Sequence, residues 1–209
     1  MAGRLLILGA GGHGRAVADL AAECGWDVAG FTDRSPGPGV LGEDDAVEDL
    51  IRAGKVDAAI VGLGNTALQR RAELFELLKK AGATTPTLVH PCASVARTCR
   101  IGEGTVVFPG VVLGAAVEVG DNVVLYSNTV AEHDSRIASH AYLSPGAILS
   151  GSVTVEASAF VGAGAVILPG ISVGPGATVG AGAVVTARVA AGATVLGSPA
   201  RQIASKGGA

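Results

Sequence analysis

A six-residue period runs from Val89 to Val185 and constrains the fold more than any other feature of the chain. Of the seventeen residues at this spacing, sixteen are Val, Ile or Leu, and the remaining one is Ala131. The position four residues further along is small or β-branched in each repeat from Cys99 to Ala183. A strict period of six is neither helical nor a simple alternation. It therefore predicts a coil of short parallel strands that stack like residues above like.

The hexad resembles that of the hexapeptide-repeat acyltransferases, whose fold is a left-handed parallel β-helix. Three hexads form one coil in that family, so seventeen hexads imply between five and six coils. Glycines recur at the expected turns, where we predict a positive φ or a close backbone approach. These glycines are Gly102, Gly120, Gly162, Gly174 and Gly180.

Residues 1–88 have a different character from the repeat. They hold 21 of the Asp, Glu, Lys and Arg residues, whereas the following 121 residues hold 12. Apolar runs predict strands at residues 4–8, 27–31 and 58–61, and helical spacing predicts helices at 15–24 and 66–81. We therefore expect an α/β plus β protein, with a small Rossmann-like βαβ domain over 1–88 and a left-handed parallel β-helix over 89–209.

One hexad, residues 131–136, is rich in charge within a region that is otherwise poor in it. It contains Glu132, His133 and Asp134. An imidazole titrates near neutral pH, so it can accept a proton from an attacking group and return it later. An adjacent carboxylate can fix the tautomer of such an imidazole and favour its charged form. His133 and Asp134 are therefore candidates for general-base catalysis of acyl transfer.

The stretch LYSNTVAEHDSRIASHAYLSPGA, residues 125–147, resembles the catalytic segment of bacterial sugar acetyltransferases. The types in question acetylate a sialic acid hydroxyl or the amine of a UDP-amino sugar. The resemblance extends to GAGGHG near the start, to LVHP at residues 88–91 and to GSPAR near the end. It implies that His133 is the general base, that Asp134 supports it, that the Gly151 N–H is the oxyanion donor, and that acetyl-CoA is the acetyl donor.

Two residues depart from the family pattern. Tyr126 stands where Asn is common, and Tyr142 stands where a second His usually contacts the thioester end of CoA. A tyrosine hydroxyl can still donate a hydrogen bond. His140, which strand alternation would place on the same face as Tyr142, is a weaker candidate for the missing imidazole.

The motif at residues 9–14, GAGGHG, satisfies GxGxxG between a predicted strand and a predicted helix, and Asp33 follows 19 residues after Gly14. Alone, it suggests a dinucleotide site with phosphates at the helix N-terminus. Residues 1–88 provide only one of the two halves of such a fold, so a single nucleotide fits better. The resemblance implies that this domain holds the UDP part of the acceptor. The expected contacts come from Gly11, Gly12, His13, Gly14, Asp33, Arg34 and the turn at 62–65, which includes Gly64 and Asn65.

Several classes of protein are disfavoured by composition. The net charge of −3 argues against a nucleic-acid partner. Cys24, Cys92 and Cys99 form an odd set without CxxC spacing, so we predict no metal site and a cytoplasmic location. The start of the chain does not read as a signal peptide, and no apolar run is long enough to span a membrane.

The leading interpretation is an acetyl-CoA-dependent N-acetyltransferase that acts on a nucleotide-activated, UDP-linked amino sugar. The alternatives are an O-acetyltransferase acting on sialic acid or a related sugar, and a non-catalytic scaffold that binds a sugar nucleotide. The resemblance also implies a homotrimer with CoA bound between neighbouring β-helices. The residues expected at CoA are Tyr142, Gly151, Ala163, Ala181, Pro199 and Arg201.

Overall fold

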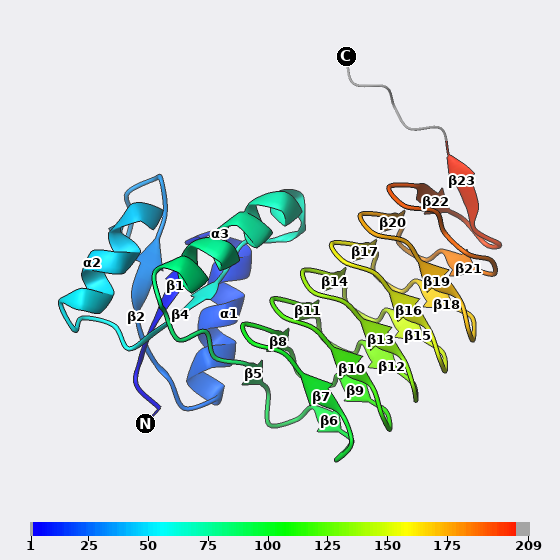
Figure 1. The fold of residues 1–209 in the computed structure, drawn as a ribbon, viewed down its shortest axis with the longest axis horizontal. Helices are drawn as coiled ribbons and strands as arrows, with labels where there is room; N and C mark the ends of the chain where they lie inside the picture. The colour runs from blue at the N-terminus through cyan, green and yellow to red at the C-terminus, as the bar shows by residue number, and fades with distance from the viewer. Residues whose placement is uncertain (1, 204–209) are drawn as a thin grey trace. The chain divides into compact units, whose positions relative to one another are not determined.

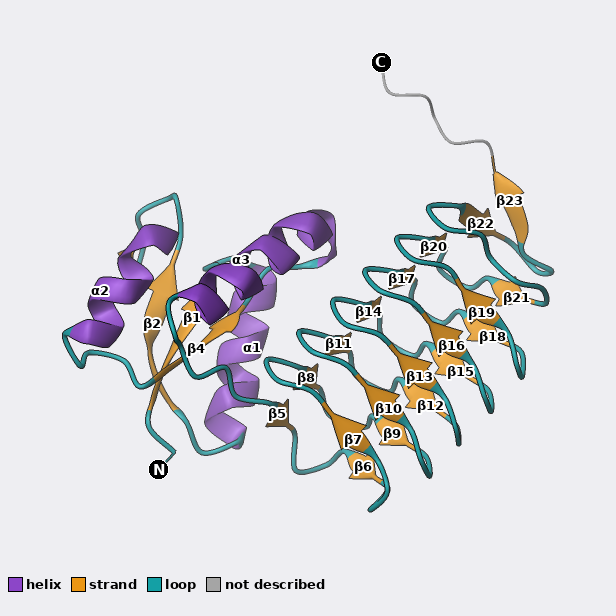
Figure 2. Ribbon diagram, in the orientation of Figure 1, coloured by secondary structure: helices purple, strands orange, loops and turns teal. Residues whose placement is uncertain are grey.

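The computed structural model describes residues 2–203, which form two compact units with the boundary between Pro91 and Cys92 (Figure 1). The predicted boundary, after residue 88, lies three residues earlier. The first unit is an α/β domain and the second a parallel β-solenoid, as Figure 2 shows by secondary structure. The predicted fold class is confirmed.

The first unit contains a parallel sheet in the order β3-β2-β1-β4. Its strands are β1 (Arg4–Leu8), β2 (Asp27–Thr32), β3 (Val40–Gly42) and β4 (Ala58–Val61). The helices are α1 (Gly12–Glu23), α2 (Val47–Arg52) and α3 (Leu68–Lys80), with short 3₁₀ turns η1 (Asp44–Ala46) and η2 (Asn65–Ala67). The two-residue strand β5 (Leu88–Val89) lies near the end of this unit.

The core of the sheet follows from strand alternation. Leu6 and Leu8 of β1 pack with Ala59 and Val61 of β4 and with the apolar side chains of α2 and α3. Leu5 and Ile7 point to the opposite face and are also fully buried. A strand that is buried on both faces is expected to be apolar throughout, which explains why β1 and β4 lack polar alternation.

The sequence predicted the three longer strands of this sheet but not β3 or α2. β3 has three residues and pairs with β2 by Phe31↔Val40 and Thr32↔Gly42. α2 has only six residues. Helix α1 begins at Gly12, three residues before the predicted start at Arg15, because the glycines there were interpreted as turn residues.

The second unit stacks three sheets of short strands, which are parallel except for the final pair β22–β23. The charged face is the sheet β7-β10-β13-β16-β19, the aromatic face runs through β8-β11-β14-β17-β20-β22-β23, and the apolar face is β6-β9-β12-β15-β18-β21. Paired residues on successive coils are 18 apart, as in Val119↔Ile137 and Ala131↔Leu149, except where β20 pairs with β22, Thr178↔Thr194. The strands are β6 (Ser94–Val95), β7 (Arg100–Ile101), β8 (Val106–Val107), β9 (Val112–Leu113), β10 (Glu118–Val119), β11 (Val124–Leu125), β12 (Val130–Ala131), β13 (Arg136–Ile137), β14 (Tyr142–Leu143), β15 (Ile148–Leu149), β16 (Thr154–Val155), β17 (Phe160–Val161), β18 (Val166–Ile167), β19 (Ser172–Val173), β20 (Thr178–Val179), β21 (Val184–Val185), β22 (Thr194–Leu196) and β23 (Arg201–Ile203).

The aliphatic residue of each hexad points into the solenoid, whereas the residue before it points outward. Leu113, Leu125 and Leu149 are at most 1% exposed, whereas the outward residues Val112 and Ile148 are 38% and 39% exposed. The predicted turn glycines serve close approach and not positive φ: a Cβ on Gly162 would lie 2.5 Å from the Ala181 nitrogen. Each coil is thereby held tightly on the next.

Candidate active site

His133 and Asp134 lie at the corner between β12 and β13, where the chain turns from the apolar face to the charged face. Asp134 has φ +59°, a left-handed conformation that carboxylate and amide residues adopt more readily than most. The turn brings His133 Nδ1 within 2.8 Å of Asp134 Oδ2, and each side chain is 63% exposed. A carboxylate can only accept, so Nδ1 carries the hydrogen and Nε2 is left as the acceptor.

Gly151 follows His133 by 18 residues, at the same corner of the next coil. A Cβ on Gly151 would lie 2.6 Å from His133 Nε2 and 2.7 Å from Cε1, so the imidazole occupies the space that any side chain would need. The coils are joined here by the Ser152 N–H, which donates to the His133 carbonyl at 2.8 Å. Within residues 2–203, the Gly151 N–H has no acceptor. The proton acceptor and a spare backbone donor therefore lie side by side.

Tyr126 and Tyr142 belong to a row of rings on the aromatic face. Tyr126 stacks on Phe108 with centroids 4.4 Å apart, and Tyr142 lies between Tyr126, at 6.2 Å, and Phe160, at 5.8 Å. Tyr142 is only 5% exposed in the single chain, and burial raises the pKa of Tyr126. The role of Tyr142 at the thioester therefore stays a prediction, with its ring packed into this row in the single chain.

His140 is not on the same strand face as Tyr142. It lies in a turn with φ +65°, and its Nδ1 is 3.0 Å from the Asn122 amide nitrogen. Strand alternation does not apply to a turn residue, so that expectation was wrong.

The residues predicted at CoA do not all gather around His133 within one chain. Ala163 and Ala181 are exposed at the opposite edge of the apolar face, one coil apart, and the Gly182 N–H donates to the Ala163 carbonyl at 2.8 Å. Arg201 lies on β23, which pairs antiparallel with β22, and Pro199 is in the turn that joins these strands. One chain brings Gly151 to His133. The other predicted CoA residues lie on the aromatic face (Tyr142), at the far edge of the apolar face (Ala163 and Ala181) or at the final hairpin (Pro199 and Arg201).

In the first unit, the glycines of residues 9–14 have two separate tasks. A Cβ on Gly14 would lie 1.9 Å from the Gly9 carbonyl oxygen, so Gly14 permits close packing of α1 on β1. Gly11 and Gly12 are exposed, and a Cβ there would meet no atom within 3.5 Å. The first turn of α1 contains no acidic residue. The N-terminal end of a helix, with its backbone N–H groups and its dipole, is suited to bind an anion.

Asp33 follows the end of β2 and is fixed by the backbone. Its carboxylate accepts from the Ala10 N–H at 3.0 Å and the Ser35 N–H at 2.9 Å, and these bonds hold its pKa below the usual value, with the Ser35 bond the larger cause. Asp33 lies between two open pockets. One, of about 410 Å³, is lined by the glycine-rich turn, Arg15, Phe31 and residues 35–38. The other, of about 350 Å³, is lined by Gly9, Thr32, Asp33, Arg34, Asp44, Leu63 and Arg70.

His13 is half-buried beneath the glycine-rich turn. Burial, and secondarily the nearby Arg71, lowers the pKa of His13 to about 3. Arg71 is fully buried and donates to the Leu63 carbonyl at 2.5 Å. Gly64 is close to His13, since a Cβ on it would lie 3.6 Å from the His13 Cβ, whereas Asn65 is exposed. The predicted residues thus gather where β1 and β4 end, which is where the sheet order reverses and such folds bind ligands.

The sequence analysis missed Asp44 and Arg70. Arg70 lies in the first turn of α3, where the helix dipole disfavours a cation. Its partner is Asp44, 26 residues earlier, with Nη2 2.9 Å from Oδ2. The sequence did contain a signal for a distant acidic partner. Arg70 is a basic residue in the first turn of a helix, and that turn has no acidic residue.

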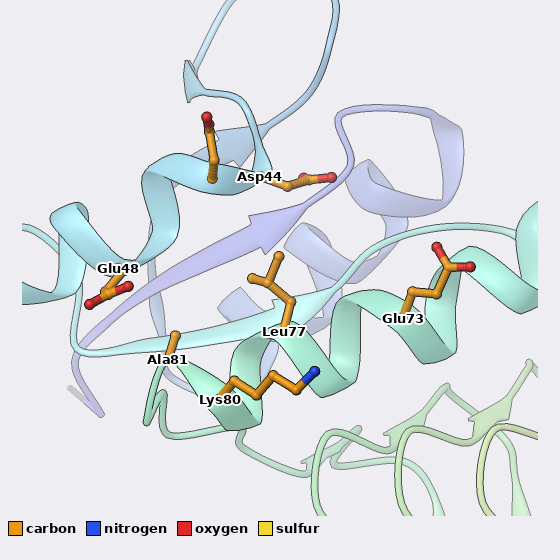
Figure 3. Close-up of a pocket in the computed structure, with 7 residues that line it drawn as sticks. Asp44, Glu48, Glu73, Leu77, Lys80 and Ala81 are labelled. Atoms are coloured by element: carbon orange, nitrogen blue, oxygen red, sulfur yellow. The ribbon is translucent and has the colours of Figure 1, made fainter.

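A larger pocket of about 520 Å³ lies between α2 and α3 (Figure 3). Its charged lining residues are Asp44, Asp45, Glu48, Glu73 and Lys80, with Leu77 and Ala81 beside them. Four carboxylates against one ammonium disfavour phosphate in this pocket. Among residues 2–203, no cluster of side chains suited to a metal ion is found, and no described helix is long and apolar enough to cross a membrane.

A parallel β-helix of hexads with a His–Asp pair at one corner defines a hexapeptide-repeat acyltransferase. Two family models match: the PglD N-terminal domain over residues 4–77 and the hexapeptide repeat of succinyl-transferase over residues 152–187. The chain belongs to the family of bacterial hexapeptide-repeat sugar N-acetyltransferases. No match was found among the curated proteins.

Solved structures cover almost the whole chain. A His-to-Ala mutant of GDP-perosamine N-acetyltransferase from Caulobacter crescentus, in complex with CoA and GDP-perosamine, is 31% identical, with a TM-score of 0.92 and 97% of each chain covered. The acetyltransferase domain of PglB from Neisseria gonorrhoeae, in complex with acetyl coenzyme A, is 32% identical, with a TM-score of 0.89, covering 96% of this chain and 98% of that one. WeeI from Acinetobacter baumannii is 28% identical, with a TM-score of 0.83, covering 95% and 99%.

Proposed function

We propose that the protein transfers the acetyl group of acetyl-CoA to the amino group of a nucleotide-diphosphate amino sugar. The observation that carries this proposal is the position of His133, whose Nδ1 is bonded to Asp134 while Nε2 lies over Gly151. The neighbours in complex with CoA, acetyl-CoA and GDP-perosamine support the choice of substrates. They also favour N-acetylation over O-acetylation, and an enzyme over a scaffold.

The chemistry requires a base and an oxyanion donor at one point. Acetyl-CoA supplies an activated acyl group, and the absence of a side chain on Gly151 leaves its backbone accessible to the thioester. His133 Nε2 removes the proton from the attacking amine as the C–N bond forms. The Gly151 N–H donates to the carbonyl oxygen as that oxygen gains charge. His133 then returns its proton to the sulfur as the C–S bond breaks, so no covalent enzyme intermediate is needed.

The first unit binds the nucleotide in this proposal. The diphosphate lies at the start of α1, where Gly11 and Gly12 leave the backbone open, and Asp33 accepts from the ribose. The resemblance in sequence favours a UDP-linked sugar, whereas the Caulobacter neighbour carries GDP-perosamine. Either nucleotide is compatible with the transfer step, because the uracil or guanine ring takes no part in it.

A homotrimer completes the CoA site in this proposal. The apolar face presents Val112, Val130, Ile148, Val166 and Val184 outward, whereas the charged face presents Arg100, Glu118, Arg136, Thr154 and Ser172. Burying the aliphatic row against copies of itself removes apolar surface from water. In a closed three-fold ring with this face inward, its His133 edge meets the Ala163 edge of the next copy. CoA then binds between copies, with His133 from one and Ala163 and Ala181 from the other.

Thiol release tests the proposal directly. The purified protein is mixed with acetyl-CoA and, in turn, UDP-amino sugars, a GDP-amino sugar, CMP-sialic acid and free sialic acid. We expect one thiol released for each N-acetylated sugar nucleotide, and no release with the sialic acids. Thiol release only with a sialic acid, accompanied by ester formation, would overturn the assignment.

A further inference from the structure

We propose that the pocket lined by Asp33, Arg34, Asp44 and Arg70 holds the base of the acceptor nucleotide and that Arg70, together with Asp44, selects guanine. This inference rests on the proposed function, since it assumes that the first unit binds the acceptor. The pocket has a volume of about 350 Å³ and lies beyond the ends of β1, β2 and β4.

The position of the base follows from the other parts of the nucleotide. Phosphates are best accommodated at the start of α1, where Gly11 and Gly12 are exposed and no acidic side chain lies in the first turn. The ribose then lies at Asp33, whose carboxylate is fixed by the Ala10 and Ser35 N–H groups. In the pocket itself the two carboxylates, Asp33 and Asp44, balance the two guanidiniums, so the lining has no net positive charge to hold a diphosphate. The base is therefore the part of the nucleotide that this pocket accommodates.

Arg70 is held in place as a preformed hydrogen-bond donor. Its Nη2 is 2.9 Å from Asp44 Oδ2, and its Nη1 is 3.2 Å from Glu73 Oε2. Asp44 is fixed in turn by the buried Thr32, whose hydroxyl donates to Oδ1 at 2.7 Å. Asp44 and Glu73 come from different elements, as Figure 3 shows. A guanidinium restrained from two sides loses little conformational entropy when it binds a ligand.

The chemistry of the pair fits guanine better than uracil. A guanidinium has five N–H groups, and two of those on Arg70 are used by Asp44 and Glu73. Guanine presents two adjacent acceptors, N7 and O6, followed by two adjacent donors, N1–H and N2–H. Arg70 can bind the acceptors while the neighbouring Asp44 carboxylate accepts from the donors. Uracil offers one N–H between two separated oxygens, so it satisfies fewer of these groups.

Calorimetry with GDP and UDP on the full chain tests this proposal. For the wild type we expect GDP to bind at least tenfold more tightly than UDP. Arg70→Met and Arg70→Lys should each weaken GDP binding by about 5- to 150-fold, the range for losing a bidentate guanine contact, and change UDP binding by less than about threefold. Lysine keeps the charge but not the fork, so its effect separates base recognition from general electrostatic attraction.

Two arginines provide matched controls. Arg52 lies on α2 and is also held by two carboxylates, at 2.6 and 2.9 Å, so Arg52→Met should leave both affinities unchanged. Arg15 lines the other pocket beside Asp33, so Arg15→Met should leave the GDP-to-UDP ratio unchanged. Equal affinity of the wild type for both nucleotides, or equal losses in Arg70→Met, would overturn the proposal. If acetyl transfer to sugar nucleotides is retained in that case, the proposed function stands; absence of transfer to any of them would remove the proposed function itself.

Discussion

The placement of single residues around His133 explains why a glycine occupies position 151. The His133 imidazole fills the space beside Gly151, so a Cβ at that position would lie 2.6 Å from Nε2. The neighbouring atom belongs to an exposed side chain, which can move more easily than backbone. A substitution at Gly151 should therefore affect the position of the His133 imidazole much more than the stability of the solenoid.

We predict that Gly151→Ala lowers kcat by about 10²-fold, the loss expected when a reacting group is misplaced by about 1 Å. The melting temperature should change by only a few degrees. Ser150→Ala, one residue earlier in the same turn, serves as the control and should retain wild-type turnover. An unchanged kcat for Gly151→Ala would show that the observed imidazole position is not the reactive one.

His13 is predicted to make stability depend on pH. Its pKa is about 3 in the folded protein and about 6.5 when unfolded, so the folded state binds fewer protons between these values. Its contribution is complete above pH 6.5 and is lost as the pH falls towards 3. The free energy of unfolding should therefore decrease by up to roughly 1.4 kcal/mol per pH unit in this window.

Urea unfolding of the wild type and of His13→Asn from pH 7 to pH 4 measures this effect. The pH slope of the variant should be smaller, whatever its stability at pH 7. Identical slopes would place the titrating group elsewhere.

At the scale of elements, different glycines of the turn at residues 9–14 serve helix packing and ligand binding. Gly14→Ala would place a methyl group 1.9 Å from the Gly9 carbonyl, so we predict a loss of about 1–3 kcal/mol of stability or more. Gly12→Ala is the matched control, because its Cβ would meet only Arg15, at 3.9 Å, and alanine favours a helix. Urea unfolding of both variants measures the difference, and equal stabilities would contradict the packing account.

The same elements show how far sequence reasoning extends. The hexad period predicted the solenoid because its period, burial and strand pairing all coincide at multiples of six. It could not predict β3 or α2, since short elements depend on tertiary pairing more than on their own residues. His133 stood out as a charged interruption of an aliphatic pattern. The link between Asp44 and Arg70 joins separate elements, so no local pattern contains it.

At the scale of the whole molecule, the apolar face predicts assembly. Ile148 projects from the middle of this face and is 39% exposed in the single chain. We expect the wild type to have about three times the 20.5 kDa chain mass by light scattering, and Ile148→Arg to be a monomer with weakened CoA binding. A charge buried at an interface without a partner is strongly unfavourable.

Thr154→Arg provides the control, because Thr154 points outward from the charged face. This variant should remain trimeric and bind CoA normally. A wild-type monomer of 20.5 kDa with full activity would exclude both the trimer and the shared CoA site.

The most direct test of the central claim is the turnover number of His133→Ala with acetyl-CoA and the preferred amino-sugar nucleotide. The side chain is exposed, so the variant should fold, and circular dichroism and melting temperature verify this. Arg136→Ala, a nearby exposed residue paired with Glu118, is the control and should retain turnover. We predict that His133→Ala lowers kcat by about 10²–10⁴-fold, the range for loss of a general base. A kcat within about twofold of wild type would contradict the account.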